Sequence, residues 1–196
     1  MNASQTEPTT LVSPITPDSA VDHHEPSGQQ AARFALEFSD GNLTGLRKYL
    51  ARTREARDWQ DRILMLDFVA PAIPLDVLET ACAIEPDAAD LAIVRCAYYS
   101  LQTMEQRFGN FDEASALSVR KAADSIRAAM TSLEAAAELD PADPTAFACI
   151  MRALGIFDKL KPVMQHAFQQ AIAIAPELAG FLATRQLAPA SSNLPN

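Results

Sequence analysis

The amino-acid sequence predicts an all-α protein, and three observations support this. Alanine and leucine are abundant, whereas glycine occurs only 6 times in 196 residues. Apolar residues recur three and four positions apart over several long segments, which is the spacing of one helix face. No stretch alternates apolar and polar residues between turn signals, as the strands of a β-hairpin would.

The N-terminal part is predicted to be a tail followed by two helices. Residues 1–30 are rich in Pro, Ser, Thr and Asp and contain no Lys or Arg, so we expect a disordered acidic tail. A short apolar stretch over 31–38 predicts the first helix. Leu46, Leu50 and Thr53 then share one face of a second helix.

Two further helices are expected before the middle of the chain. Asp58 can cap a helix that begins at Trp59, because a side-chain oxygen at this position accepts a bond from the first turn. Pro71 and Pro74 interrupt that helix, since proline lacks the backbone N–H. A short helix is then expected over 75–84.

The remaining helices follow the same rules. We expect them over about 87–107, 113–140 and 145–157, then from Pro162, and finally over 177–186. The first has an apolar stripe of Leu91, Val94, Tyr98, Leu101 and Met104. The inner face of the second is Val119, Ala122, Ala123, Ile126, Met130 and Leu133. Residues 108–112 form an insertion between these two helices, and 187–196 form a second disordered tail.

A helix end and a helix start are combined in the segment Ser132–Phe147. Pro141 should end the first helix near Asp140. Asp143 precedes Pro144, an arrangement typical of an N-cap residue before a proline at the first helical position. The same pattern of an alanine five residues before a proline ends two other helices, at Pro86 and Pro176. The short connections predict antiparallel neighbouring helices.

These residues resemble the tetratricopeptide repeat, a helix–turn–helix unit of about 34 residues. Pro141 and Pro176 are 35 residues apart, and Phe168 and Ala171 occupy the family's second-helix positions. The resemblance covers roughly 58–185 and implies antiparallel hairpins stacked as a short solenoid within a domain of residues 31–186. The first-helix signature of Trp, Leu-Gly and Tyr is missing, so a non-repeating helical bundle is the alternative.

The resemblance also implies a binding groove lined by the first helices of the repeats. In this chain the groove would draw on Arg95, Tyr99, Arg152 and Lys159. The family's clamp for a terminal carboxylate needs Lys, Asn and Arg on successive first helices, and that pattern is incomplete here. The predicted ligand is therefore a peptide or helix of another protein.

Charge gives a second candidate site. The net charge is −9, which disfavours binding to nucleic acids and anionic membranes. Against this background a basic run extends from Arg47 to Arg62, with a central patch at Lys48, Arg52, Arg54 and Arg57. The run either binds an acidic peptide or RNA, or is a solvated face with pairs such as Asp58–Arg62.

No catalytic motif, phosphate loop or metal-ligand spacing occurs in the sequence, so neither an enzyme nor a cofactor is expected. Cys96, His166 and Arg152 would be the candidates for an unfamiliar active site. The three cysteines are interpreted as buried free thiols in a reducing compartment. A cytoplasmic location is expected, because neither a signal peptide nor a membrane-spanning segment is evident.

These observations predict a non-catalytic protein–protein interaction module, such as a small adaptor or chaperone. Two alternatives remain open. One is an immunity or antitoxin-like protein that neutralises a partner, and the other is RNA binding through the Arg47–Arg62 helix. In each case except the last the partner is another protein.

Overall fold

The computed structural model describes residues 28–108 and 116–187, and these residues form α-helices and short 3-10 turns with no β-strand. The prediction of an all-α chain is therefore confirmed for this part of the protein. The helices are α1 (Gly28–Ser39), α2 (Thr44–Ala56), α3 (Trp59–Val69), α4 (Leu75–Ile84), α5 (Ala89–Phe108), α6 (Ala116–Leu139), α7 (Thr145–Gly155), α8 (Lys161–Ile174) and α9 (Ala179–Leu187). The 3-10 turns are η1 (Ala70–Ala72), η2 (Asp158–Leu160) and η3 (Pro176–Leu178).

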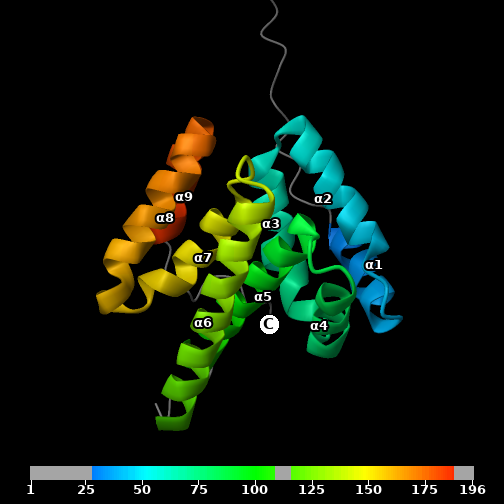
Figure 1. Ribbon diagram of the computed structural model, residues 1–196, viewed down its shortest axis with the longest axis horizontal. Helices are drawn as coiled ribbons and strands as arrows, with labels where there is room; N and C mark the ends of the chain where they lie inside the picture. The colour runs from blue at the N-terminus through cyan, green and yellow to red at the C-terminus, as the bar shows by residue number, and fades with distance from the viewer. Residues whose placement is uncertain (1–27, 109–115, 188–196) are drawn as a thin grey trace, which may run out of the picture.

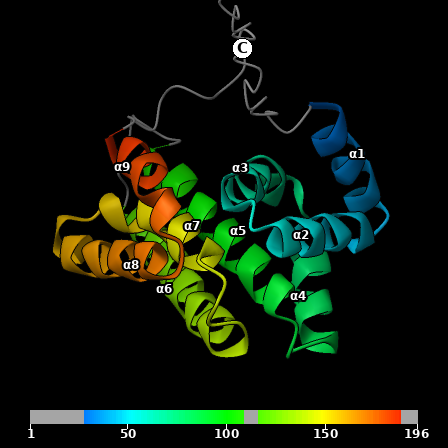
Figure 2. The ribbon, with the colours of Figure 1, turned by 90° about the horizontal axis from the view of Figure 1, so that it is seen from above.

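Helix α5 lies at the centre of the fold. It contacts α2, α3 and α4 on one side and α6 and α7 on the other (Figures 1 and 2). The predicted stripe is buried at Leu91 and Val94, whereas its later members are only half-buried. Ile93 and Cys96 are buried as well, which a single stripe does not explain. A helix with neighbours on several sides buries more than one face.

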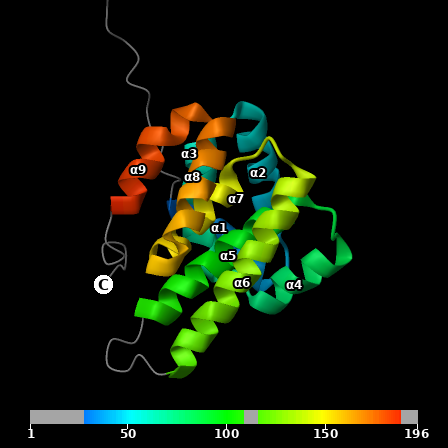
Figure 3. The same ribbon diagram turned by 60° about the vertical axis from the view of Figure 1, so that its left-hand side comes forward.

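Helices α5 and α6 form an antiparallel hairpin, and α7 and α8 form a second one (Figure 3). Alanines at 122, 129 and 136 are buried on α6 and let its backbone come close to its neighbours. Val119 was expected on this inner face, but the prediction is wrong, because its side chain is 46% exposed. Val119 lies in the first turn of α6, at the end of the hairpin that projects away from the other helices (Figure 1).

The turn between α6 and α7 lies where the positions of Pro141 and Pro144 predicted it. Helix α6 ends at Leu139, and the Asp140 N–H donates to the Ala136 carbonyl at 2.9 Å. Asp143 Oδ1 accepts a hydrogen bond of 2.9 Å from the Thr145 N–H, so this carboxylate pairs the first backbone donor of α7 from the position before the N-cap. The helix begins at Thr145, as expected, but Pro144 is its N-cap residue and not its first helical residue, so the prediction of Asp143 as the N-cap is wrong.

The N-terminal helices follow the predicted boundaries closely. Asp58 is the N-cap of α3 and accepts a 3.3 Å hydrogen bond from the Asp61 N–H. Pro71 lies in η1, and α4 begins directly after Pro74. Helix α1 begins at Gly28, so 28–30 are helical rather than part of a tail. Helix α9 ends at Leu187, so this residue of the predicted C-terminal tail is helical as well. Residues 1–27, 109–112 and 188–196 lie outside the described residues.

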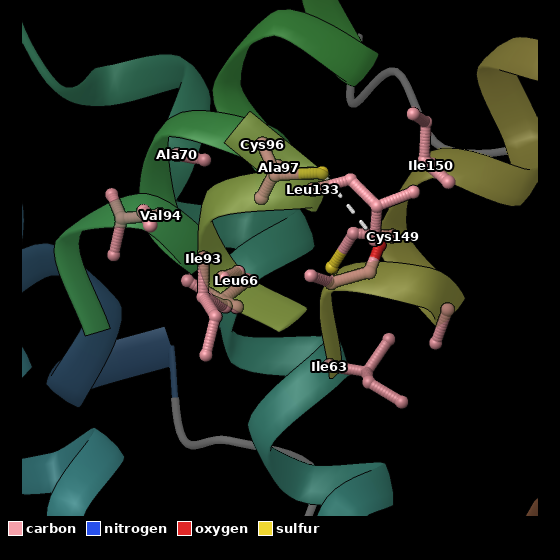
Figure 4. Packing of buried hydrophobic residues seen from close by; sticks show 14 of the residues in the cluster. Ile63, Leu66, Ala70, Ile93, Val94, Cys96, Ala97, Leu133, Cys149 and Ile150 are labelled. Atoms are coloured by element: carbon pink, nitrogen blue, oxygen red, sulfur yellow. Dashed lines mark hydrogen bonds between the residues drawn. The ribbon is translucent and has the colours of Figure 1, made fainter. Parts of the chain in front are cut away.

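Helix α3 joins the two halves of the molecule, because it contacts α1, α2, α5 and α7. Its Ile63 and Leu66 lie in the same buried cluster as Cys96 of α5, Leu133 of α6 and Ile150 of α7 (Figure 4). One hydrophobic core therefore connects the helices before α5 with those after it. No described helix combines the length and apolar character that crossing a membrane requires.

Candidate functional site

Half of the cations in the predicted basic run are paired with acidic residues of the same chain. Arg62, at its end, is 1% exposed and lies with Nη2 2.9 Å from Asp143 Oδ2. Its Nε donates to Thr145 Oγ1 at 3.1 Å, and Nη1 donates to the Leu50 carbonyl. The predicted Asp58–Arg62 pair is therefore wrong: Arg62 points into the protein, where burial lowers its pKa and Asp143 opposes that effect.

Arg47 and Arg54 are also paired over long sequence distances. Arg47 Nη1 lies 2.8 Å from Glu85 Oε1, and its Nε lies 2.6 Å from Asp90 Oδ2. Arg54 pairs with Asp140 in the turn between α6 and α7. This guanidinium holds the pKa of Asp140 below its usual value. These pairs connect α2 to the beginning of α5 and to the α6–α7 turn.

Three cations of the run stay at the surface. Lys48, Arg52 and Arg57 are exposed, and the Arg52 guanidinium lies 5.1 Å from the centre of the Tyr49 ring. Arg57 ends α2 with a φ of 56°, a left-handed conformation that is uncommon for residues with a side chain. Three dispersed cations, two of them on α2, give little electrostatic basis for binding a polyanion.

Two of the predicted groove residues, Arg95 and Tyr99, bind the same carboxylate, that of Glu79. Arg95 Nε and the Tyr99 hydroxyl donate to Glu79 Oε1 at 2.9 and 2.8 Å, and Arg95 Nη2 lies 2.8 Å from Glu79 Oε2. Glu79 is on α4, whereas both partners are on α5. Arg95 and Tyr99 therefore attach α4 to the central helix, and part of their hydrogen-bonding capacity is used there.

Arg152 and Lys159 lie in another part of the fold. Arg152 of α7 contacts Asp67 of α3 at 3.4 Å, and Arg185 of α9 contacts the same carboxylate at 2.5 Å. Lys159 is exposed in η2. Among the described residues no hydrogen bond or ion pair joins these residues to Arg95 or Tyr99. Helix α3 packs against both α5 and α7. The groove hypothesis requires these two helices to be accessible to a ligand.

A cleft that the sequence did not indicate lies between α4 and the turn from α1 to α2. Its volume is about 360 Å³. Leu43 and Leu91 are its buried residues, Val77 and Ala81 of α4 are half-buried, and Ile84 is 73% exposed. The cleft also contains side chains of Asn42, Thr44, Arg47, Asp76, Thr80 and Glu85. The only signal in the sequence was an isoleucine at the end of a helix, directly before Glu85 and Pro86.

The wall formed by the α1–α2 turn is held rigidly by local hydrogen bonds. Gly41 adopts a φ of 70°, which reverses the chain after α1. Asn42 Oδ1 accepts from the Thr44 N–H at 2.9 Å, and Glu37 Oε2 accepts from the Gly45 N–H at 3.2 Å. A Cβ atom at Gly45 would overlap the Glu37 carboxylate, so glycine is needed for this contact. The backbone donors at the start of α2 are thus already used.

The residues named for a possible active site, Cys96, Arg152 and His166, lie on three different helices, α5, α7 and α8. Cys96 and Cys149 are buried free thiols, and burial raises the pKa of Cys96 to about 12. A thiol in such surroundings is a poor nucleophile. His166 is exposed on α8 beside Gln165 and Gln169. Within residues 28–108 and 116–187 no group of His, Cys, Asp and Glu side chains is arranged to hold a metal ion.

Comparison with known proteins gives no relative: no family model, no curated protein and no solved structure matches this chain. What the fold defines is an all-α protein with one core shared by its N- and C-terminal helices. The candidate site rests on the geometry of the cleft alone.

Proposed function

We propose that this protein is a non-catalytic binding module that takes a segment of another protein into the cleft between α4 and the α1–α2 turn. The main support for this proposal is the exposure of Ile84, an isoleucine that is 73% exposed at the mouth of a cleft of about 360 Å³. Exposed aliphatic side chains around a concave site are typical of protein interaction surfaces. A volume of this size accepts one or two side chains of a partner.

The polar groups of the cleft support a protein ligand over a small polar molecule. Small-molecule sites place a few convergent polar groups around the ligand to orient it. Here Arg47 and Glu85 are paired with each other, and the N–H groups of Thr44 and Gly45 are bonded within the turn. The remaining lining combines Leu43, Val77, Ala81, Ile84 and Leu91 with Asp76 and Thr80, so binding would depend largely on apolar contact.

The proposal retains a tetratricopeptide-like organisation for the C-terminal part of the chain. The hairpins α5–α6 and α7–α8 would be two repeats, and α9 would cap them. Contacts of α7 with α5, α6, α8 and α9 support this arrangement. Helices α1–α3 would then cover the face formed by α5 and α7, so the partner would bind at α4 instead of in the family's groove.

The test is to purify the tagged protein from its own host in three forms. These are the unmodified chain, the Ile84→Glu variant, and the control variant Leu117→Glu. Leu117 is 60% exposed on α6, so the two substitutions are similar in chemistry but lie on different helices. We expect one protein to co-purify in near-stoichiometric amounts with the unmodified chain and the control, but not with Ile84→Glu.

Two results would contradict the proposal. The first is a folded, monomeric protein that retains no partner in any form. The second is a partner that remains bound to Ile84→Glu as strongly as to the unmodified chain, which would place the binding surface elsewhere. Circular dichroism of all three forms verifies that the helices are intact.

A further inference from the structure

The interior of the cleft is aliphatic. Leu43 and Leu91 are 7% and 1% exposed, and Val77 and Ala81 of α4 complete the wall. Helix α4 has one fully buried residue, Leu78, whereas its Val77 and Ala81 are half-buried. A branched aliphatic side chain that enters here removes apolar surface of both partners from water, which favours binding.

The rim of the cleft is acidic. Asp76 and Glu85 lie on its α4 side, and Asp90 lies close to the Arg47 guanidinium. Arg47 contacts both Glu85 and Asp90 and is the one cation that lines the cleft. Among the residues that line the cleft, two carboxylates (Asp76 and Glu85) and one guanidinium leave an excess of one negative charge, and Asp90 lies outside the lining. Asp76 is exposed and has no ion pair within the described part of the chain.

We infer that the partner segment presents an aliphatic anchor residue with a lysine or arginine within one helical turn of it. This inference rests on the proposed function and specifies the chemistry of its ligand. The anchor side chain lies between Val77, Ala81 and Leu43. The neighbouring cation lies at Asp76, the rim carboxylate without a partner of its own. Complementary charge at the rim selects the partner and accelerates its association.

The inference is tested by selecting random 12-residue peptides displayed on phage. The full chain is the bait, and clones that also bind Ile84→Glu are discarded. We expect the remaining clones to share an aliphatic residue with Lys or Arg within four positions. The strongest clone is then synthesised as a free peptide, and its Kd is measured by fluorescence anisotropy at low and high salt.

Three substitutions locate the charge effect. Thr80→Lys adds a cation to the cleft wall and leaves the first turn of α4 unchanged, whereas Asp76→Asn removes the unpaired carboxylate. Glu177→Lys changes the charge of an exposed residue in η3 and is the control. We expect Thr80→Lys and Asp76→Asn to weaken binding about tenfold and about threefold at low salt. Both effects should shrink at high salt, since added ions screen exposed charges.

The outcomes separate this inference from the proposed function. Two results would contradict a basic partner segment but retain the cleft as a binding site. The first is a set of selected clones with acidic residues beside the anchor. The second is binding that Ile84→Glu abolishes but Asp76→Asn and Thr80→Lys leave unchanged. A selection with no clone specific to the unmodified chain would overturn both the inference and the proposed function. Self-association in sedimentation that Ile84→Glu removes would identify a second copy of this chain as the occupant and also overturn the inference.

Discussion

At the scale of single residues, the contact between Arg62 and Asp143 is a fully buried ion pair. Both side chains are 1% exposed, so each charge has lost its water and relies on the other. Arg62 also donates to Thr145 and to the Leu50 carbonyl, which joins α2, α3 and the α6–α7 turn. A buried ion pair of this kind is costly to break from one side only.

We predict that Asp143→Asn lowers the free energy of unfolding by about 3–5 kcal/mol, because the Arg62 charge would be left without its counter-ion. The measurement is urea unfolding followed by circular dichroism. The control is Asp140→Asn, which removes the partner of Arg54, a side chain 48% exposed. A pair at the surface contributes about 0–1 kcal/mol.

A third variant tests whether the unpaired charge of Arg62 causes the loss of stability. Combining Arg62→Met with Asp143→Asn removes the buried cation and should recover part of the lost stability. If Asp143→Asn and Asp140→Asn had equal effects, Arg62 would have to be solvated in solution.

The cysteines give a second prediction at this scale. Burial raises the pKa of all three thiols, and Cys96 and Cys149 are fully enclosed. In a titration with Ellman's reagent at pH 8, we expect only the half-buried Cys82 to react in the native protein, and all three thiols to react in denaturant. Cys82→Ala should abolish the native reaction. Rapid reaction at Cys96 would instead support an enzyme with an activated thiol.

At the scale of elements, α4 is attached to the core by few buried side chains. Its one fully buried residue is Leu78, and Glu79 adds the contact with Arg95 and Tyr99. Prolines precede and follow the helix, so it is a short segment with breaks at both ends. The proposed binding cleft thus has one rigid wall, the α1–α2 turn, and one wall held by few contacts.

We predict that Leu78→Ala costs about 2–5 kcal/mol of stability, as loss of a buried leucine side chain usually does. Leu75→Ala in the same helix is the control and should cost less than about 1 kcal/mol, because Leu75 is 41% exposed. Hydrogen exchange should show faster exchange of the α4 amides in Leu78→Ala than in Leu75→Ala. Equal exchange in both variants would contradict this assignment of the buried face.

At the scale of the whole molecule, the helices before and after α5 share one core. Ile63 and Leu66 of α3 belong to the same cluster as Leu133 and Ile150. The Arg62–Asp143 pair and the contacts of Asp67 with Arg152 and Arg185 cross between the same two halves. We therefore expect the described helices to unfold as one unit, unlike a long array of independent repeats.

The single tryptophan allows this to be measured. Trp59 is 4% exposed at the start of α3, so its fluorescence reports on the N-terminal half, whereas circular dichroism reports on all helices. The two urea transitions should coincide. A fluorescence change at lower urea than the dichroism change would mean that α1–α3 unfold separately from the α5–α8 hairpins.

The sequence by itself determined the helices and most of their ends. Asp58 caps α3 as predicted, and α4 has the predicted bounds of Leu75–Ile84. These features depend on interactions within about four residues, which can be recognised in a linear sequence. The small alanines of α6 and the central position of Leu91 and Val94 in the core were predicted for the same reason.

Only the tertiary structure decided which charges pair, which helix lies at the centre and where the cleft opens. Arg47 contacts Glu85 across 38 residues, and Arg54 contacts Asp140 across 86. Such contacts depend on how the helices cross and on which faces their neighbours cover, and no local pattern encodes this. The basic run therefore resembled a binding surface, whereas packing turned half of it into internal ion pairs and created the candidate site at α4 instead.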